Sequence, residues 1–377
     1  MELLIVIVVI VILAAITVVA YNGVSANAHA AALKADLAQA VNKLGVYRVD
    51  NGAWPTSLDA AGVKMANGEN IDLAVSGDTY CLAATDGTRN FHVTDSNNVP
   101  QTGSCDGVVC PAGYIQVPGN PTLGTNNFCV MKYEAKNDGS GNAVSTATGT
   151  PWTNISQTSA ISTAAAACSG CHLITEPEWM TIAANVLSVP SNWSGGAVGS
   201  GFIYQGHINN NPASALAAST DDTDGLNGMT GGIGGAGANN RRTLTLTNGE
   251  AIWDFSGNAY EWTQGVITGA QPGLASDNVN GNIYSLKQWN NGSMNWNSLS
   301  ASSQPSVLAS TPGVSAINSW SSTNGIGQLN SNQNQSAADA FFRGGGWGGS
   351  GAAGVLTLYL SDTPSYPDVA VGFRVAQ

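Results

Sequence analysis

The chain has 377 residues, of which only 10% are Asp, Glu, Lys or Arg, and its formal net charge is -12. The acidic balance excludes a nucleic-acid binder, which needs a basic face to neutralise phosphates. So few charges also argue against a cytosolic enzyme with an ordinary charged surface. Hydrophobic residues reach 43% and include ten tryptophans, which excludes long-range disorder. The composition fits a secreted or surface-exposed, β-rich protein with two or three domains of roughly 100–200 residues each.

An apolar segment over residues 3–20 opens the chain and contains no charged residue. As a helix it would span roughly 27 Å, about the thickness of a bilayer core. Glu2 precedes it, where a signal peptide or signal anchor would carry Lys or Arg. A carboxylate at the end of an apolar helix is costly in lipid, which favours a functional reason for Glu2. A plain membrane anchor is the alternative.

Helical character continues to about Arg48. An amphipathic pattern places the charged residues Lys34, Asp36 and Lys43 between six apolar ones: Ala28, Ala31, Ala32, Ala35, Ala38 and Leu44. We therefore expect one long helix over residues 1–48, with a weak point at Asn22-Gly23.

This combination resembles the N-terminal part of mature type IV pilins, as do the residues that follow it: Tyr47, Gly52, Pro55, Ser57 and Leu58. The resemblance implies a pilin-like domain over residues 1–106, in which the long helix packs on a small β-sheet. It also implies that the chain sits in the inner membrane and then joins identical subunits in a helical filament on the cell surface. The residues expected to act in assembly are Glu2, Leu3, Leu4 and Ile5. Members of this family carry a leader and a few residues before the glutamate, so we expect that Met1 is not the mature N-terminus.

Six cysteines in an acidic chain with an export segment predict three disulfides. The spacing favours local pairing within three successive segments, which are bracketed by Cys81 and Cys105, by Cys110 and Cys129, and by Cys168 and Cys171. The last pair forms a CxxC, which in a cytosolic protein would suggest redox activity or zinc binding. No second CxxC accompanies it, so we expect a structural disulfide.

Three blocks in residues 107–377 carry further signals. Residues 128–136 alternate as a strand does. A helix is expected to start at Thr175, with Glu178 completing a capping box and Pro177 in the first turn. Residues 252–262 place two carboxylates and an amide among aromatic residues.

Two further stretches, residues 225–240 and 300–336, are of low complexity and are predicted to be long surface loops.

In this order the blocks, together with the ending Phe342-Arg-Gly-Gly-Gly-Trp347 and Gly372-Phe-Arg-Val-Ala376, resemble the formylglycine-generating enzyme/sulfatase-modifying-factor family. That family has a fold related to C-type lectins. The resemblance implies an α+β protein in which a C-type-lectin-like domain over residues 107–377 follows the pilin-like part. Copper-binding members have two cysteines after the matching RGGS motif, whereas no cysteine follows Cys171 here. We therefore expect no catalytic residues, no copper and no iron.

The same ending also resembles the variable proteins of diversity-generating retroelements, which display hypervariable residues on a C-type-lectin domain. The resemblance implies a scaffold of Val355, Leu356, Leu358 and Leu360. The residues expected to bind a ligand are Trp347, Thr357, Tyr359, Ser361, Asp362, Ser365, Tyr366 and Asp368. Tyr, Ser and Asp suit adaptable binding surfaces. An ordinary C-terminal hairpin that buries its Leu face is the alternative.

The function expected from these features is adhesion to an unknown surface protein or glycan by a non-catalytic head on a filament. A purely structural coat subunit is the first alternative, and a metal-dependent oxidase is a weaker one.

Calcium is a possible cofactor. Hard oxygen donors at close spacing suit it, and the enzyme family named above carries a calcium site in this motif. The expected ligands are Gly257, Asn258, Ala259 and Glu261. A hydrogen-bonded turn with Trp253 and Trp262 in the core is the alternative. The acidic turn at Asp221, Asp222 and Asp224 is expected to be a solvated loop rather than a weak calcium site.

Overall fold

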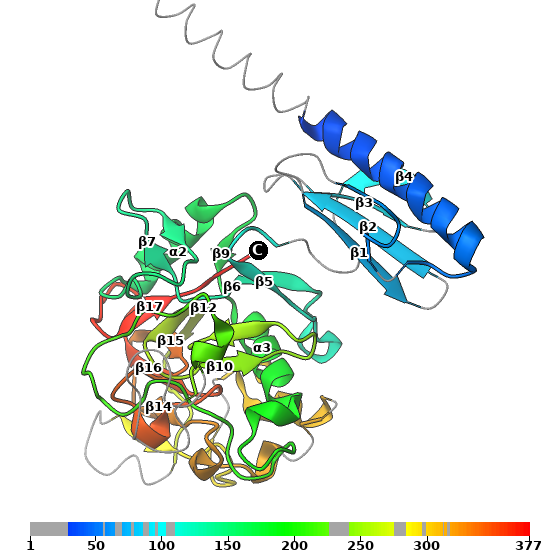
Figure 1. Cartoon of the computed structure of the whole chain (residues 1–377). Coiled ribbons are helices and arrows are strands. Elements are labelled where there is room, and N and C mark those ends of the chain that lie inside the picture. Colours follow the sequence, from blue (N-terminus) through cyan, green and yellow to red (C-terminus); the bar gives the residue numbers. More distant parts are fainter. Residues whose placement is uncertain are drawn as a thin grey trace, which may run out of the picture. The chain divides into compact units, whose positions relative to one another are not determined.

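The protein, represented by a computed structural model, divides into two compact units, Met1–Pro111 and Ala112–Gln377 (Figure 1), here called the N-terminal unit and the head. The structure describes residues 29–377 except 56, 65–69, 77–78, 86–89, 95–96, 103–109, 226–240, 275–283, 296–298, 312 and 315–316. The boundary expected after residue 106 falls within one of these gaps.

The predictions for the apolar segment 3–20 also lie outside the described residues, as do those for Glu2, Leu3, Leu4 and Ile5. In the part of the chain that is described, no helix is both long enough and apolar enough to span a membrane.

In the N-terminal unit, a helix over residues 29–51 packs on a four-stranded antiparallel sheet. The strands pair in chain order. The helix ends where Gly52 turns left-handed (φ +74°). There the Gly52 N–H donates to the Arg48 carbonyl at 2.8 Å. The strands are β1 (Asn70–Ser76), β2 (Thr79–Thr85), β3 (Asn90–Thr94) and β4 (Asn97–Thr102).

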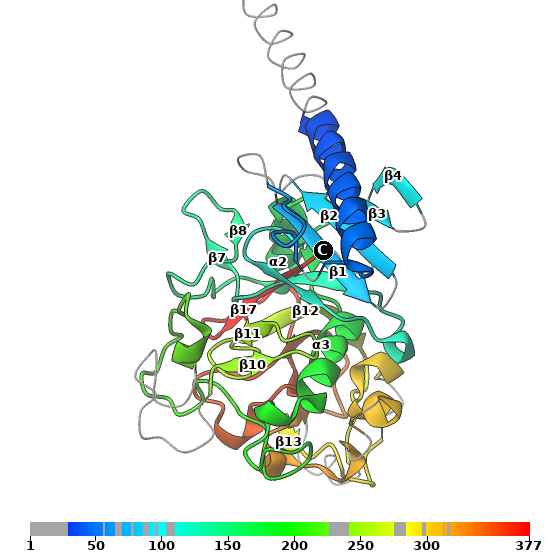
Figure 2. The same ribbon diagram turned by 45° about the vertical axis from the view of Figure 1, so that its right-hand side comes forward.

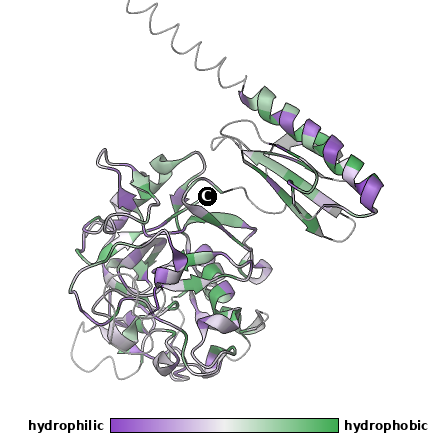
Figure 3. Cartoon of the chain, viewed as in Figure 1, coloured by the Kyte–Doolittle hydropathy of each residue, from purple (hydrophilic) through white to green (hydrophobic). Residues whose placement is uncertain are grey.

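The face that this helix buries includes Leu44 from the predicted pattern but otherwise differs from it. Against the sheet lie four residues spaced three or four apart, Leu33, Leu37, Ala40 and Leu44. Ala31, Ala35 and Ala38 are exposed instead. Leucine has more apolar area to bury, and the exposed alanines support the helix through their high propensity. Figure 3 shows the resulting mixture of hydrophobic and hydrophilic positions along the helix.

The head combines strands and helices and is dominated by strands. Its larger sheet has six strands in the order β13-β14-β16-β15-β12-β17, and a second sheet has the order β5-β6-β18-β9. Two short ladders, β10-β11 and β7-β8, complete it. The strands are β5 (Tyr114–Val117), β6 (Phe128–Met131), β7 (Lys136–Asn137), β8 (Ala143–Val144), β9 (His172–Leu173), β10 (Thr243–Thr245), β11 (Ala251–Trp253), β12 (Tyr260–Thr268), β13 (Ser285–Lys287), β14 (Leu329–Ser331), β15 (Ala338–Arg343), β16 (Leu358–Asp362), β17 (Val371–Phe373) and β18 (Val375–Ala376).

The two ends of the head meet in one sheet, because β18 lies between β6 and β9. The Cys129 N–H donates to the Gln377 carbonyl at 3.0 Å, and the Gln377 N–H donates to the Cys129 carbonyl at 2.9 Å. In Figure 1 the red C-terminal segment accordingly reaches the strands at the beginning of the head.

Two α-helices accompany these sheets, α2 (Gln157–Ala167) and α3 (Glu176–Ser188). The predicted start of α3 is confirmed, since Thr175 and Glu178 form the capping box. Trp179, Ile182 and Ala183 lie on its buried face and are 0% exposed. Figure 2 shows α3 beside β10 and β12.

Two predictions about the course of the chain are corrected. Residues 128–136 do not form one strand, because β6 ends at Met131 and β7 begins at Lys136. All four residues of β6 are buried, so the strand is covered on both faces. Residues 300–336 are not simply a surface loop. They contain β14, four short 3-10 turns and core residues such as Leu308 and Trp320.

The C-terminal hairpin alternative is also excluded. β16 pairs with β14 and β15, whereas β17 pairs in parallel with β12 at the edge of the sheet. The segment between β16 and β17 is therefore a crossing connection rather than a hairpin turn.

The CxxC is a disulfide, with Cα atoms of Cys168 and Cys171 5.1 Å apart. Cys81, Cys110 and Cys129 are disulfide-bonded as well. Cys105 lies outside the described residues, so its pairing with Cys81 stays a prediction.

Candidate functional site

A buried ion pair anchors the segment from which the predicted ligand-binding residues extend. Arg343, at the end of β15, is 0% exposed and bonds to the Glu176 carboxylate, with its Nε 3.1 Å from Oε1. It also donates to the carbonyls of Ser303 (3.0 Å) and Leu356 (3.3 Å). The Thr263 hydroxyl donates to Glu176 Oε1 at 2.6 Å. These bonds join α3, β12, β15 and the segment before β16. They therefore fix the base of residues 347–368, which carry the predicted ligand-binding side chains and are here called the display region.

Two further arginines are held in the same way. Arg374 donates to Glu261 at 2.7 and 3.0 Å, and Arg242 donates to Asp254 at 2.6 and 2.7 Å. All four side chains are at most 2% exposed. Each arginine also donates to two backbone carbonyls, so four of its five N–H groups are bonded. A buried ion pair needs such additional bonds to offset its desolvation.

The residues predicted to bind calcium do not fit that ion. The Glu261 carboxylate is occupied by Arg374. The side-chain amide oxygen (Oδ1) of Asn258 accepts from the Leu216 N–H at 2.7 Å, and the Ala259 N–H donates to Glu134 at 2.9 Å. Gly257 adds a left-handed turn (φ +83°). These bonds favour the alternative, a hydrogen-bonded turn whose Trp253 and Trp262 are 0% exposed. Among the described residues, no group of three His, Cys, Asp or Glu could hold a metal ion.

The acidic turn at 221–224 is bonded within the head. Asp221 accepts from Thr223, and Asp224 accepts from the Ser219 hydroxyl at 2.6 Å. Asp222 pairs with Lys132 at 2.8 Å and accepts from the Trp253 indole at 2.9 Å. These carboxylates hold the turn in place.

A group that sequence reasoning missed lies behind the turn at residues 254–259. Glu134, 2% exposed, accepts hydrogen bonds from Asn258 and Ala259. Burial, with Asp254 and Glu261 nearby, raises the pKa of Glu134 well above its usual value. Its neighbour in sequence, Lys136, is also buried, and burial lowers the pKa of the Lys136 ammonium. Both residues occur in the strand-like motif at 128–136, but alternation alone does not indicate that their side chains are buried.

The display region has the predicted alternation over most of its length. The four predicted scaffold residues (Val355, Leu356, Leu358 and Leu360) are all 0% exposed. Tyr359, Ser361 and Asp362 are half-buried between and beyond them. After β16, Ser365 and Tyr366 are exposed, Tyr366 at 54%.

Thr357 is a correction, because it is 0% exposed and faces inward. Its hydroxyl donates to the Ala352 carbonyl at 2.7 Å. The reason is that residues 355–357 precede β16 in a turn, where side chains do not alternate as they do in a strand.

Trp347 and Asp368 lie at the two ends of this region. Trp347 is half-buried, and its N–H donates to the Asn258 carbonyl at 2.9 Å. Asp368 is half-buried, and its side chain accepts from the Ala370 N–H at 2.6 Å. Its carbonyl accepts from the Asn154 N–H at 2.9 Å, which ties the region to the segment before α2.

Tyr359 belongs to an aromatic cluster whose three rings come from three neighbouring strands. The ring centroids of Tyr260 (β12) and Tyr359 (β16) are 5.0 Å apart, and that of Phe342 (β15) lies 5.3 Å from Tyr260 and 5.4 Å from Tyr359. Aromatic pairs at these separations stabilise beyond their buried area. Burial and the neighbouring Tyr359 raise the pKa of Tyr260. Sequence reasoning missed Tyr260, because only the sheet order brings these three residues together.

Asp362, at the end of β16, lies near two other carboxylates, those of Asp368 and Asp339. Burial, with Asp368 and Asp339 nearby, raises the pKa of Asp362 to about 6. Asp339 itself is 1% exposed and accepts from Gln271 (2.6 Å) and the Tyr284 hydroxyl (3.0 Å). The charge of this patch therefore changes near pH 6.

Comparisons with known proteins give weak structural similarities. The chain is similar to the "Major Tropism Determinant I1 Variant" at 12% identity and a TM-score of 0.34, covering 83% of this chain and 72% of that one. It is similar to the "Major Tropism Determinant M1 Variant" at 11% identity and a TM-score of 0.29, with the same coverage. Both TM-scores are below 0.5, so neither likeness identifies the fold of this chain. No family model and no curated protein sequence matches it.

Proposed function

We propose that the head is a non-catalytic, C-type-lectin-like module that binds a surface protein or glycan through residues 347–368. The observation that carries the proposal is the contrast within and after β16. Leu358 and Leu360 are 0% exposed, while Tyr359 and Asp362 are half-buried and Tyr366 is 54% exposed. A rigid frame with Tyr and small polar side chains on its surface gives contact area at low entropic cost.

The buried carboxylates support a binding role over a catalytic one. Glu176, Glu261 and Asp254 each pair with an arginine inside the head, and these bonds hold strands together. Carboxylates used in this way serve the frame rather than acid–base chemistry.

The pilin-like part of the proposal concerns the N-terminal unit. We propose that it joins identical copies in an extracellular, cell-surface filament after a membrane-anchored stage. Its amphipathic helix on a small antiparallel sheet is compatible with this role. The helix also exposes Val46 at 62% and Val49 at 85%, an apolar edge available to a neighbouring subunit.

The test is binding of the full chain to an array of surface proteins and glycans, followed by two variants. Tyr366→Ala should lower the affinity for any ligand found on the array by tenfold or more. The midpoint of thermal unfolding should not change, because this side chain is 54% exposed. Tyr47→Ala, on the helix of the N-terminal unit, is the matched control and should bind normally. The proposal fails if nothing on the array shows saturable binding, or if Tyr366→Ala binds as tightly as the wild-type chain.

A further inference from the structure

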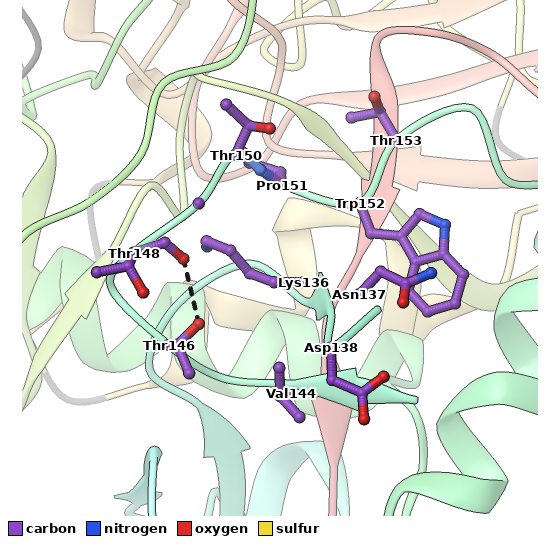
Figure 4. A pocket seen from close by; sticks show the side chains of 11 residues that line it. Lys136, Asn137, Asp138, Val144, Thr146, Thr148, Thr150, Pro151, Trp152 and Thr153 are labelled. Atoms are coloured by element: carbon purple, nitrogen blue, oxygen red, sulfur yellow. Dashed lines mark hydrogen bonds between the residues drawn. The ribbon is translucent and has the colours of Figure 1, made fainter. Parts of the chain in front are cut away.

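A cavity of about 700 Å³ opens on the head beside β7 and β8 (Figure 4), and none of its lining residues belongs to the display region. One side is formed by the β7–β8 hairpin and the other by the segment 146–153 that leads toward α2. Its lining combines one aromatic ring, one ammonium group and several hydroxyls: Lys136, Asn137, Asp138, Val144, Thr146, Thr148, Gly149, Thr150, Pro151, Trp152 and Thr153.

The ammonium group at this cavity has unused hydrogen-bonding capacity. Lys136 is 4% exposed, and its Nζ donates to the Glu134 carbonyl at 3.0 Å. Within the described residues no carboxylate lies at ion-pair distance from it. The nearby acids are bonded elsewhere, Glu134 to Asn258 and Ala259, and Asp254 to Arg242. A lysine ammonium has three donors, so two remain for an acceptor in the cavity.

The aromatic wall is held in place from behind. The backbone N–H of Trp152 donates to the Ala135 carbonyl at 2.8 Å. The indole ring lies edge-on to the Phe373 ring, with the two centroids 5.8 Å apart. Trp152 is half-buried and is one of the residues that line the cavity (Figure 4). An aromatic face fixed at a cavity wall can stack against the C–H face of a sugar ring.

Hydroxyl groups on the remaining wall are also available. Thr148 and Thr150 are exposed and Thr153 is half-buried, and in the described structure none of their hydroxyls makes a hydrogen bond. Thr146 differs, since its hydroxyl donates to the Thr148 carbonyl at 3.2 Å. Hydroxyls that both donate and accept suit a ligand with several hydroxyl groups.

The single carboxylate on the lining, Asp138, is committed to its own turn. It accepts from the Ser140 N–H (2.7 Å) and from the backbone and side chain of Asn142 (3.0 and 2.8 Å). These bonds lower the pKa of Asp138, the Asn142 side chain contributing most. Asp138 therefore stays ionised but is held in its own turn, and the cation of the lining is the Lys136 ammonium.

We propose that this cavity binds a pyranose that carries a carboxylate, such as a uronic acid residue. The carboxylate pairs with Lys136, the ring stacks on Trp152, and the sugar hydroxyls bond to Thr148 and Thr150. This site goes beyond the proposed function, because it uses none of the residues of the display region.

The experiment titrates the full chain with sodium glucuronate, methyl glucoside and sodium acetate, read by calorimetry and by indole fluorescence. Glucuronate should bind at least tenfold more tightly than methyl glucoside, and acetate should not bind measurably. Lys136→Met should remove the preference for the acid. Thr150→Val, at an exposed position, should weaken glucuronate binding about fivefold. Thr122→Val, at an exposed threonine that does not line this cavity, should leave it unchanged.

Equal binding of the two sugars, or binding of acetate as tight as that of glucuronate, overturns the ligand assignment. No saturable binding of either sugar overturns the site itself, whatever the display region binds. If Lys136→Met does not fold, Thr150→Val decides the question alone, since normal glucuronate affinity in that variant also overturns the proposal. Loss of array binding in Tyr366→Ala with normal glucuronate binding would separate the two surfaces.

Discussion

The ion pair beneath the display region gives the sharpest stability prediction. Glu176→Gln removes the negative charge but keeps the size of the side chain. Arg343, 0% exposed, then remains as a buried cation without its anion. Removing one partner of such a pair costs about 3–5 kcal/mol. Its bonds to Ser303 and Leu356 survive, so we expect the lower half of that range, about 3 kcal/mol.

Urea unfolding of the head, followed by near-ultraviolet circular dichroism, measures this loss of unfolding free energy. For a unit of this size, the same loss should lower the midpoint of thermal unfolding by about 6–12 °C. Glu250→Gln, the same change at an exposed residue, is the control and should stay within about 0.5 kcal/mol of the wild type. The double variant Glu176→Met/Arg343→Met should be more stable than Glu176→Gln, because no unpaired charge is left inside. A loss below about 1 kcal/mol in Glu176→Gln would refute the claim that this pair supports the frame.

Three further predictions follow from the site. Burial raises the pKa of Asp362 from 3.8 to about 6, so the folded state retains a proton that the unfolded chain releases. Stability should then fall by roughly 1–2 kcal/mol as pH rises from about 4 to 6, after allowance for partial exposure; Asp362→Asn should abolish this fall in denaturant titrations at each pH. Thr357→Val should lower the free energy of unfolding by about 1 kcal/mol, because it removes a buried hydrogen bond. Tyr366→Ser should leave the unfolding midpoint unchanged, and equal effects of the two variants would contradict the inward placement of Thr357. Because Glu261 is paired with Arg374, excess calcium or a chelator should not shift the unfolding midpoint, and a clear calcium-dependent shift would show that the turn does bind the ion.

Local features of the sequence predicted local structure well. The capping box at Thr175 and Glu178 fixes the start of α3, because its bonds lie within four residues of one another. The CxxC likewise forms a disulfide whose partners are three residues apart. The helix over residues 29–51 could be recognised from propensity. Among the described residues of the predicted pattern, however, only Leu44 lies on the buried face, where leucines bury more area than alanines.

Predictions that depended on partners distant in sequence failed or were incomplete. Calcium was expected at Glu261 because oxygen donors cluster near it, but Arg374 lies 113 residues away in the chain and occupies its carboxylate. Residues 300–336 read as loop because their composition is simple, yet β14 enters the central sheet.

The sequence by itself determined which residues are apolar and where α3 starts. It also determined which side chains of β16 point to the core and which point to the surface. Only the tertiary structure decided what each buried charge pairs with, that the rings of Tyr260, Phe342 and Tyr359 pack together, and that Lys136 and Trp152 line one cavity. The physical reason is range. Capping and alternation act over a few residues along the chain, whereas ion pairs and cavities are formed by strands that meet only after the sheet order is set.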